Sequence, residues 1–211
     1  MGKHRPLFVV VSAPSGAGKS TLCSRLLAEA PEFVYSVSCT TRAPRGDESD
    51  GVAYFFLSEA EFMERVRRGD FLEHALVHGN HYGTLKKTVS AAMAAGKSVI
   101  LDIDVEGAGQ VRRIVAGLPD GDALKEGFLD IFITAPSIEV LRARLVKRGE
   151  DSLAEIEKRL ANAVGEIARA GEFSHIVVNA ELDKTYSELR GIIADKVTGL
   201  DQRKGKGKIN A

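Results

Sequence analysis

The stretch SAPSGAGKST, residues 12–21, contains the residue types that hold the phosphates of a nucleoside triphosphate. In the pattern G-x-x-x-x-G-K-[ST], glycines let backbone N–H groups point at anionic oxygens, the lysine reaches the β- and γ-phosphates, and the hydroxyl faces Mg²⁺. Gly18, Lys19 and Ser20 match the end of this pattern. Ala13 replaces the first glycine, at the entrance to the loop, where a methyl side chain fits if φ stays negative. The stretch therefore predicts a phosphate-binding loop and not merely a glycine turn.

A strand and a helix must hold such a loop, because a helix N-terminus and its dipole favour bound phosphate. Residues 7–13, LFVVVSA, are typical of a short strand that is buried on both faces. After the loop, Leu22, Leu26 and Leu27 recur at helical spacing. We therefore expect ATP here, with Mg²⁺ near the hydroxyl of Ser20. The residues assigned to ATP in this loop are Ala13, Pro14, Ser15, Gly16, Ala17, Gly18, Lys19, Ser20 and Thr21.

The rest of the chain alternates strand and helix patterns, which predicts an α/β fold with an open, mostly parallel sheet covered by helices on both sides. Further strands are expected at 34–40, 71–83, 98–104, 128–136 and 174–179. Helices are expected at 58–69, 84–96, 105–117, 137–149, 152–171 and 182–197. Between Ser38 and Lys87 a polar loop, a short helix and short strands interrupt this order, which predicts an inserted subdomain.

Four blocks of the sequence occur in a characteristic order: SAPSGAGKST, SVSCTTRAPRGDE, FLEHALVHGNHYGT and ILDIDVEGAGQVR. Together they resemble the bacterial type of the guanylate kinase family, P-loop nucleoside monophosphate kinases that phosphorylate GMP with ATP. The likeness continues through RLVKRGEDS and VVN and spans about Leu7 to Val197. Two departures stand out: residues 117–127 are longer than usual and read as a surface loop, and Ala180 stands where the family usually has Asp.

The resemblance implies a single P-loop NTPase-type domain made of three parts. The core would comprise about 5–37, 87–136 and 171–198, the GMP-binding subdomain about 38–86, and a lid about 137–170. Residues 199–211, which include the polar and basic QRKGKGKINA, are expected to be a disordered tail. A solvated end is the simpler interpretation of this tail, and a weak nucleic-acid contact is the alternative.

The acceptor site is expected in the second and third blocks. Arg42 and Arg45, three residues apart, can clamp a phosphate with two guanidinium groups, and the hydroxyls of Tyr54 and Tyr82 can donate to it. The carboxylate of Glu73 can accept from N1–H and N2–H₂ of guanine together, whereas adenine would present a lone pair at N1. Taken alone, Arg42 and Arg45 would more often be solvated loop charges, and Glu73 could be an exposed strand residue. The GMP-binding residues implied by the resemblance are Ser38, Arg42, Arg45, Tyr54, Glu73, Tyr82, Gly83, Thr84, Asp102, Asp104 and Arg159.

Charged groups are also expected around the transferred phosphate. LDIDVEG ends a buried strand with Asp102 and Asp104, and ligands of α/β sheets bind at the carboxyl ends of strands. Alternation along the strand predicts that both acids share one face, where Asp102 can contact Mg²⁺. Arg144 and Arg148, four apart on one helix face, resemble lid arginines that reach over ATP, although a basic helix surface would look the same. The residues expected to act in catalysis are Lys19, Arg42, Arg144 and Arg148.

Composition narrows the partners and the compartment. Lys plus Arg and Asp plus Glu are 29 each, so the formal net charge is zero, which favours neither nucleic acid nor a membrane as a partner. Two cysteines without metal-type spacing and no visible signal peptide lead us to expect a cytoplasmic protein. His74 and His78 lie near His81, but two histidines four apart on a strand are about 13 Å apart, so we expect no shared metal.

These patterns predict a guanylate kinase of purine nucleotide metabolism that transfers the γ-phosphate of ATP to GMP, with dGMP as a second acceptor. Two alternatives remain in view. Some guanylate-kinase-like domains are peptide-binding scaffolds, but those typically have damaged phosphate loops, and the intact Gly18, Lys19 and Ser20 argue against that function here. A P-loop kinase for another small acceptor would lack the combination of Glu73 with the paired arginines.

Overall fold

The computed structural model describes the backbone of residues 5–207 and the side chains of residues 5–200. Its strands are β1 (Phe8–Ser12), β2 (Phe33–Tyr35), β3 (Cys39–Thr40), β4 (Phe55–Phe56), β5 (Phe71–Val77), β6 (Asn80–Leu85), β7 (Ser98–Asp102), β8 (Phe128–Thr134) and β9 (His175–Val178). Its helices are α1 (Lys19–Glu29), α2 (Glu59–Arg67), α3 (Lys86–Ala94), α4 (Val105–Ala116), α5 (Ala123–Gly127), α6 (Ile138–Arg148), α7 (Leu153–Ala168), the 3₁₀ turn η1 (Ala170–Glu172) and α8 (Leu182–Gly207).

A five-stranded parallel sheet in the order β2-β7-β1-β8-β9 forms the centre of the molecule. Along β1, Val9 and Val11 pack into one hydrophobic cluster with α1, α6, α7 and α8, whereas Phe8 and Val10 pack into another with α3, α4 and α5. Both faces of the sheet are therefore covered, as the unbroken apolar run at 7–13 predicts. The α/β fold class predicted from the sequence is confirmed.

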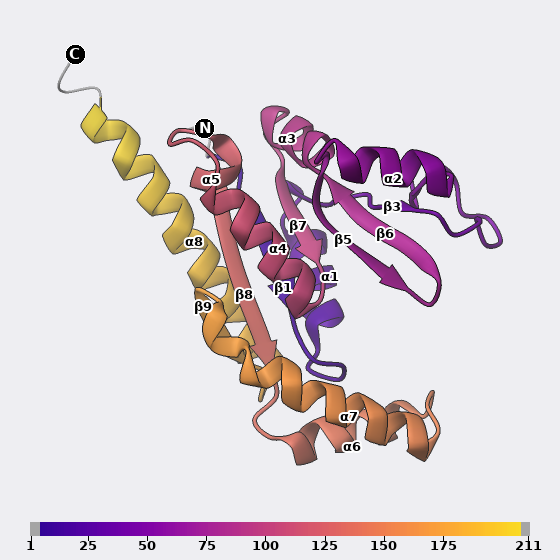
Figure 1. The fold of residues 1–211 in the computed structure, drawn as a ribbon. Coiled ribbons are helices and arrows are strands. Elements are labelled where there is room, and N and C mark those ends of the chain that lie inside the picture. Colours follow the sequence, from indigo (N-terminus) through magenta and orange to yellow (C-terminus); the bar gives the residue numbers. More distant parts are fainter. Residues whose placement is uncertain (1–4, 208–211) are drawn as a thin grey trace.

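A second, four-stranded sheet in the order β4-β3-β6-β5 lies apart from the first and is covered by α2 (Figure 1). Phe62 of α2 packs on Cys39, Phe71 and Leu85 in a third hydrophobic cluster. The helix begins at a complete capping box, in which Ser58 and Glu61 bond each other's backbone N–H, as predicted. These elements lie within residues 38–86, where the sequence predicts an insertion.

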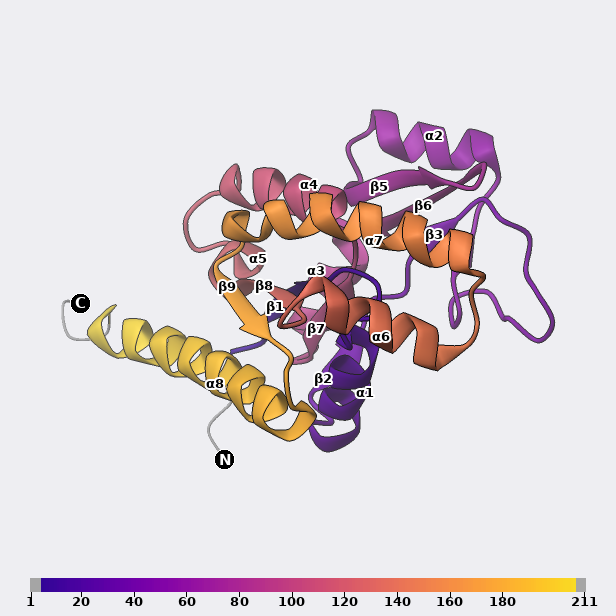
Figure 2. The ribbon, with the colours of Figure 1, turned by 90° about the horizontal axis from the view of Figure 1, so that it is seen from below.

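Helices α6 and α7 form an antiparallel pair that projects from the carboxyl-end side of the central sheet (Figures 1 and 2). Ser137 caps α6, and Ser152 caps α7 by accepting from the backbone N–H of Glu155. Gly149 ends α6 in the left-handed conformation, with φ at 70°, which glycine adopts without steric cost. Leu141 and Leu145 of α6 and Ile156 of α7 pack into the hydrophobic cluster of the central core.

The following two expectations differ from the structure. The predicted strand at 34–40 is divided into β2 and β3, which belong to different sheets, so the chain leaves the core there. Residues 199–207 continue α8 and are not a disordered tail, because Tyr186, Leu189 and Ile193 anchor this helix on the sheet and Leu200 is still buried. The remaining tail residues, 208–211, lie outside the described residues. No helix in the described part of the chain combines the length and apolarity needed to span a membrane.

Candidate active site

The loop between β1 and α1 has the backbone conformation that a phosphate cradle requires. Gly16 and Gly18 have φ values of 87° and 93°, which side-chain-bearing residues rarely adopt. Ala13 is buried and is not among the described residues with positive φ, so the missing first glycine does no harm. Gly18 precedes Lys19 at the start of α1, and no side chain caps these first N–H groups. The helix N-terminus is therefore open to an anion.

Lys19 forms an ion pair with Asp102, the last residue of strand β7 in the central sheet. Its ammonium nitrogen also lies 3.5 Å from the carbonyl oxygen of Ile103. Asp104 does not continue the strand as predicted but is the N-cap of α4, where its side chain accepts from the N–H of Gly107 at 2.7 Å. The predicted alternation of Asp102 and Asp104 along one strand is therefore wrong. Both acids nevertheless line the smaller of the two pockets described below, the one that contains Glu73.

A cavity of about 690 Å³ opens in front of the loop. It is lined by Ala13, Pro14, Ser15, Gly16, Gly18, Lys19, Ser20, Thr21, Asp102, Arg144, Arg148 and Glu166. Arg144 donates from Nη2 to the carbonyl of Asn179 at 2.7 Å, whereas its buried Nη1 has no protein partner. Arg148 pairs with Glu150. The structure thus brings both predicted arginines of α6 to the predicted phosphate loop and leaves one buried donor for a ligand.

Arg159 lies on the donor side of the site. Its Nη1 donates to Oγ of Ser15 in the phosphate loop at 3.0 Å, and its Nη2 lies 3.1 Å from Asp151. The resemblance implied that Arg159 belongs with the GMP-binding residues, but Arg159 does not line the acceptor pocket described next.

A second pocket, of about 220 Å³, adjoins the first one. It is lined by Ser38, Tyr54, Glu73, Ala75, Val77, Tyr82, Gly83, Asp102, Ile103 and Asp104. Glu73 is buried, and this burial raises the pKa of its carboxyl, while a hydrogen bond from Thr84 opposes the shift. The hydroxyls of Ser38 and Thr84 lie 3.4 Å apart across the small sheet. The carboxylate of Glu73 and the hydroxyl of Ser38 therefore line one small pocket, and the buried hydroxyl of Thr84 lies behind them, in contact with both.

Arg42 lies beside Tyr54 of this pocket and is held by its own loop. Both oxygens of Glu48 accept from its Nη2 at 2.9 Å, and its guanidinium lies 5.5 Å from the ring centre of Tyr54. The rings of Tyr54 and Tyr82 meet edge to face at 6.0 Å. Arg45 donates its backbone N–H to Glu48 at 2.8 Å, and its side chain is exposed. The structure therefore brings Arg42 and both tyrosines together and leaves the side chain of Arg45 outside.

The three histidines near Glu73 have packing and turn positions. The ring of His81 stacks on Phe62 at 5.1 Å, and that of His74 meets Phe62 edge-on at 6.4 Å. His78 has a φ of 48° in the turn between β5 and β6. The residues that the structure describes contain no group of three or more His, Cys, Asp or Glu side chains arranged for a metal ion.

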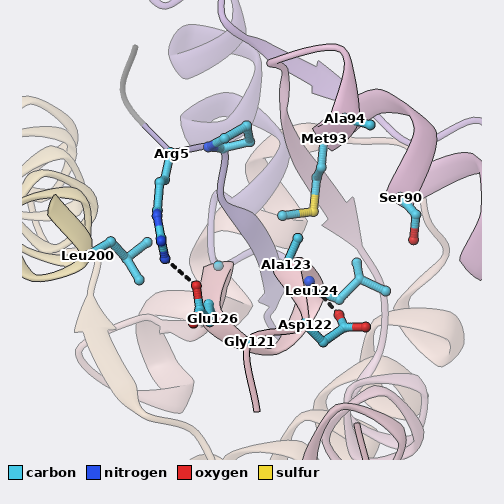
Figure 3. A pocket seen from close by; sticks show the side chains of 12 residues that line it. Arg5, Ser90, Met93, Ala94, Gly121, Asp122, Ala123, Leu124, Glu126 and Leu200 are labelled. Carbon is cyan, nitrogen blue, oxygen red and sulfur yellow. Dashed lines mark hydrogen bonds and ion pairs between the residues drawn. The ribbon is translucent and has the colours of Figure 1, made fainter. Parts of the chain in front are cut away.

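A separate cavity of about 410 Å³ lies near Arg5, Met93 and Leu124, beside the residues that lead into β1 (Figure 3). The prediction of a plain surface loop at 117–127 is wrong, because residues 123–127 form α5 with Leu124 buried. Arg5 is paired with Glu126 at its wall. This cavity lies at the opposite end of the central sheet from Lys19 and has no phosphate-binding loop.

Comparison with known proteins gives a consistent result. The family model described as guanylate kinase matches residues 4–196. A guanylate kinase of Alkalilimnicola ehrlichii is 45% identical over 183 residues, which cover 87% of this chain and 85% of that protein. The chain belongs to the guanylate kinase family. A guanylate kinase of Ruegeria pomeroyi is 42% identical over 96% of this chain and 92% of its own length. The crystal structure of guanylate kinase from Anaplasma phagocytophilum superposes with a TM-score of 0.64 at 29% identity, covering 92% of this chain and 89% of that one.

Sequence reasoning missed several side chains of this guanylate kinase site. Asn179 donates from its side-chain amide to the carbonyl of Ala17 in the phosphate loop at 2.7 Å. Its position at the end of a core strand was the available signal. Glu48 clamps Arg42 from six residues away in the same loop. Glu166 on α7 lines the large cavity, and its burial raises the pKa of its carboxyl. No local sequence pattern indicates this role.

Proposed function

We propose that this chain transfers the γ-phosphoryl group of ATP to GMP, giving ADP and GDP. One observation carries the proposal: Asp102 lines both the cavity at the phosphate loop and the pocket that contains Glu73. A nucleoside triphosphate in the first and a nucleoside monophosphate in the second would meet at the carboxyl end of β7. Ligands of open α/β sheets bind at such ends.

The reaction that fits this arrangement is a direct in-line transfer. An oxygen of the GMP phosphate attacks the γ-phosphorus while the bond to the β–γ bridging oxygen breaks, and ADP leaves with that oxygen. No side-chain nucleophile is required, because catalysis here consists of positioning and charge neutralisation. We assign the neutralisation to Lys19, Arg144 and Arg148, and the holding of the GMP phosphate to Arg42, Arg45 and the two tyrosines.

Glu73 is assigned to the guanine base. Its buried carboxylate can accept from N1–H and N2–H₂ together, while the hydroxyls of Ser38 and Thr84 can donate to O6. AMP would leave this carboxylate facing a lone pair. The assignment uses the base and the phosphate but no ribose 2′-hydroxyl, so we also propose dGMP as an acceptor.

The oxygen ligands near Lys19 suit Mg²⁺, which prefers carboxylates, hydroxyls, waters and substrate phosphates. Ser20 and Asp102 would hold the ion together with ATP, and bound Mg²⁺ would neutralise charge on the phosphate oxygens.

Residues 38–86 are assigned as the GMP-binding subdomain and α6 with α7 as a lid. Closure of the two over the substrates would exclude water and limit hydrolysis of ATP. We place the enzyme in the cytoplasm, where free thiols such as those of Cys23 and Cys39 persist.

Glu73→Gln tests the assignment of the base. The amide can accept only one of the two guanine donors, so kcat/KM for GMP should fall by roughly tenfold or more while KM for ATP changes little. Equal weakening of both substrates together with a lower melting temperature would indicate a damaged fold and would contradict the assignment.

A further inference from the structure

The side chain of Gln110 makes two hydrogen bonds to the backbone of a single residue on another element. Its Oε1 accepts from the N–H of His74, and its Nε2 donates to the carbonyl oxygen of His74, both at 3.0 Å. Gln110 lies on α4, a helix of the central core, whereas His74 lies on β5 of the small sheet. The amide thus imitates a neighbouring strand and fixes both the position and the orientation of that peptide segment.

β5 needs such a partner because it is the outer strand of the small sheet, in the order β4-β3-β6-β5. Backbone N–H and C=O groups on the outer side of an edge strand have no partner within the sheet. The pairing of β5 with β6 also shifts register between Phe71 and Glu73, so the strand is irregular at this point. The bonds from Gln110 hold the strand directly after this irregularity.

Glu73, the residue before His74, has its carboxylate near α4, the helix that carries Gln110. Its Oε2 lies 3.5 Å from the point that a Cβ on Gly107 of α4 would occupy. Its carbonyl oxygen lies 2.9 Å from the corresponding point on Gly83 of β6. Two glycines therefore leave room for Glu73, and Gln110 holds the next residue from the first turns of the same helix. Figure 2 shows α4 extending toward β5.

We propose that Gln110 is a positioning residue for guanine recognition, which acts through Glu73 by tying the small sheet to helix α4. The inference rests on the proposed function, since it requires Glu73 to read the base. A carboxylate that accepts two hydrogen bonds at once tolerates little displacement, because each bond weakens steeply as its angle closes. Loss of the Gln110 bonds would free β5 and misalign the carboxylate while leaving the ATP side intact.

The test compares GMP with IMP, which keeps N1–H but lacks the N2 amine. Wild-type enzyme should prefer GMP because Glu73 is satisfied by two donors. Gln110→Ala should lower kcat/KM for GMP by about tenfold, reduce the preference for GMP over IMP, and leave KM for ATP unchanged. Gln110→Glu, which has the same shape, should have the same effect because it replaces the donor with a carboxylate oxygen facing the carbonyl of His74. Arg113→Ala, an exposed change on the same helix, is the matched control.

A double variant separates positioning from general damage. If Gln110 acts through Glu73, then adding Gln110→Ala to Glu73→Gln should change the GMP-to-IMP preference no further. Full additivity of the two changes would overturn the inference, as would an unchanged preference in Gln110→Ala. If Glu73→Gln itself left the preference unchanged, base reading by Glu73 would fail and the role of Gln110 would fail with it. If Glu73→Gln lost the preference for GMP over IMP but Gln110→Ala kept it, only the role of Gln110 would be overturned.

Discussion

The side-chain amide of Asn179 donates a 2.7 Å hydrogen bond to the backbone carbonyl of Ala17 in the phosphate loop. The backbone carbonyl of the same asparagine accepts from Arg144 at 2.7 Å, so one buried residue joins the loop to α6. Its side-chain nitrogen also occupies the space that a Cβ on Gly18 would need, which explains why this position accommodates only glycine. Asn179, which directly follows β9, thus sets the distance between the phosphate loop and Arg144.

Asn179→Ala should therefore weaken ATP binding. The loss of a buried hydrogen bond costs about 1–3 kcal/mol of stability, and a loosened loop should raise KM for ATP by about tenfold, with KM for GMP little changed. Steady-state kinetics and urea unfolding measure the two effects. Glu181→Ala, an exposed neighbour, is the control. A destabilised variant with wild-type KM for ATP would show that Asn179 supports the fold but not the loop.

Lys19→Met should nearly abolish turnover and leave the fold intact. The lysine supplies positive charge to the phosphates, and removal of one such contact typically lowers kcat by about 10²–10³-fold. The Asp102 carboxylate also loses its ion-pair partner. Turnover by coupled assay and the far-UV circular dichroism spectrum are the measurements. Turnover within a few-fold of wild type would refute the assignment of the loop.

Arg42→Lys should raise KM for GMP even though the charge is kept. Nη2 of Arg42 donates to both oxygens of Glu48 at 2.9 Å while Nη1 donates to the carbonyl of Ala43 at 2.7 Å, and the single nitrogen of an ammonium group cannot occupy both positions. We expect an increase of about tenfold, by loss of one charge-assisted bond. Arg67→Lys, on the exposed surface of α2, should leave KM for GMP unchanged. Similar KM values for GMP in the two variants would show that Arg42 does not bind the GMP phosphate.

The pH dependence of GMP binding should follow Glu73. Only the ionised carboxylate accepts from both guanine donors, and burial raises the pKa of this group above the ordinary glutamate value. GMP binding should therefore be strong above this raised pKa and weaken as the pH falls through it, while GMP itself holds the bound carboxylate ionised. Calorimetric titration of GMP across this range measures the effect. In Glu73→Gln the dependence should disappear, and its persistence there would assign it to another group.

Much of this site could be predicted from the sequence because its groups lie in short local patterns. The phosphate loop occupies ten consecutive residues, 12–21, and the alternation of apolar runs with helix patterns specifies a parallel sheet. The same holds for Ser58 with Glu61, whose capping box marks the start of α2. Such features depend on neighbours within a few residues and need no knowledge of the packed chain.

The remaining contacts join residues that are distant in sequence. Gln110 reaches His74 across 36 positions, and Asn179 reaches Ala17 across 162. Asp104 was misplaced because a strand pattern and a helix cap overlap in LDIDVEG, and the cap prevailed once Gly107 supplied a free N–H. The end of α8 was missed because polar side chains at 199–207 hide a helix whose anchors, such as Leu189, come earlier.

The central claim is tested most directly by ADP release with GMP, dGMP, AMP, UMP and CMP as acceptors, measured in the presence of MgATP. The account predicts rapid turnover with GMP, turnover with dGMP, and rates lower by roughly 10²-fold or more with the other three, because a buried carboxylate would be left without its donors. Faster turnover with AMP or UMP than with GMP would contradict it.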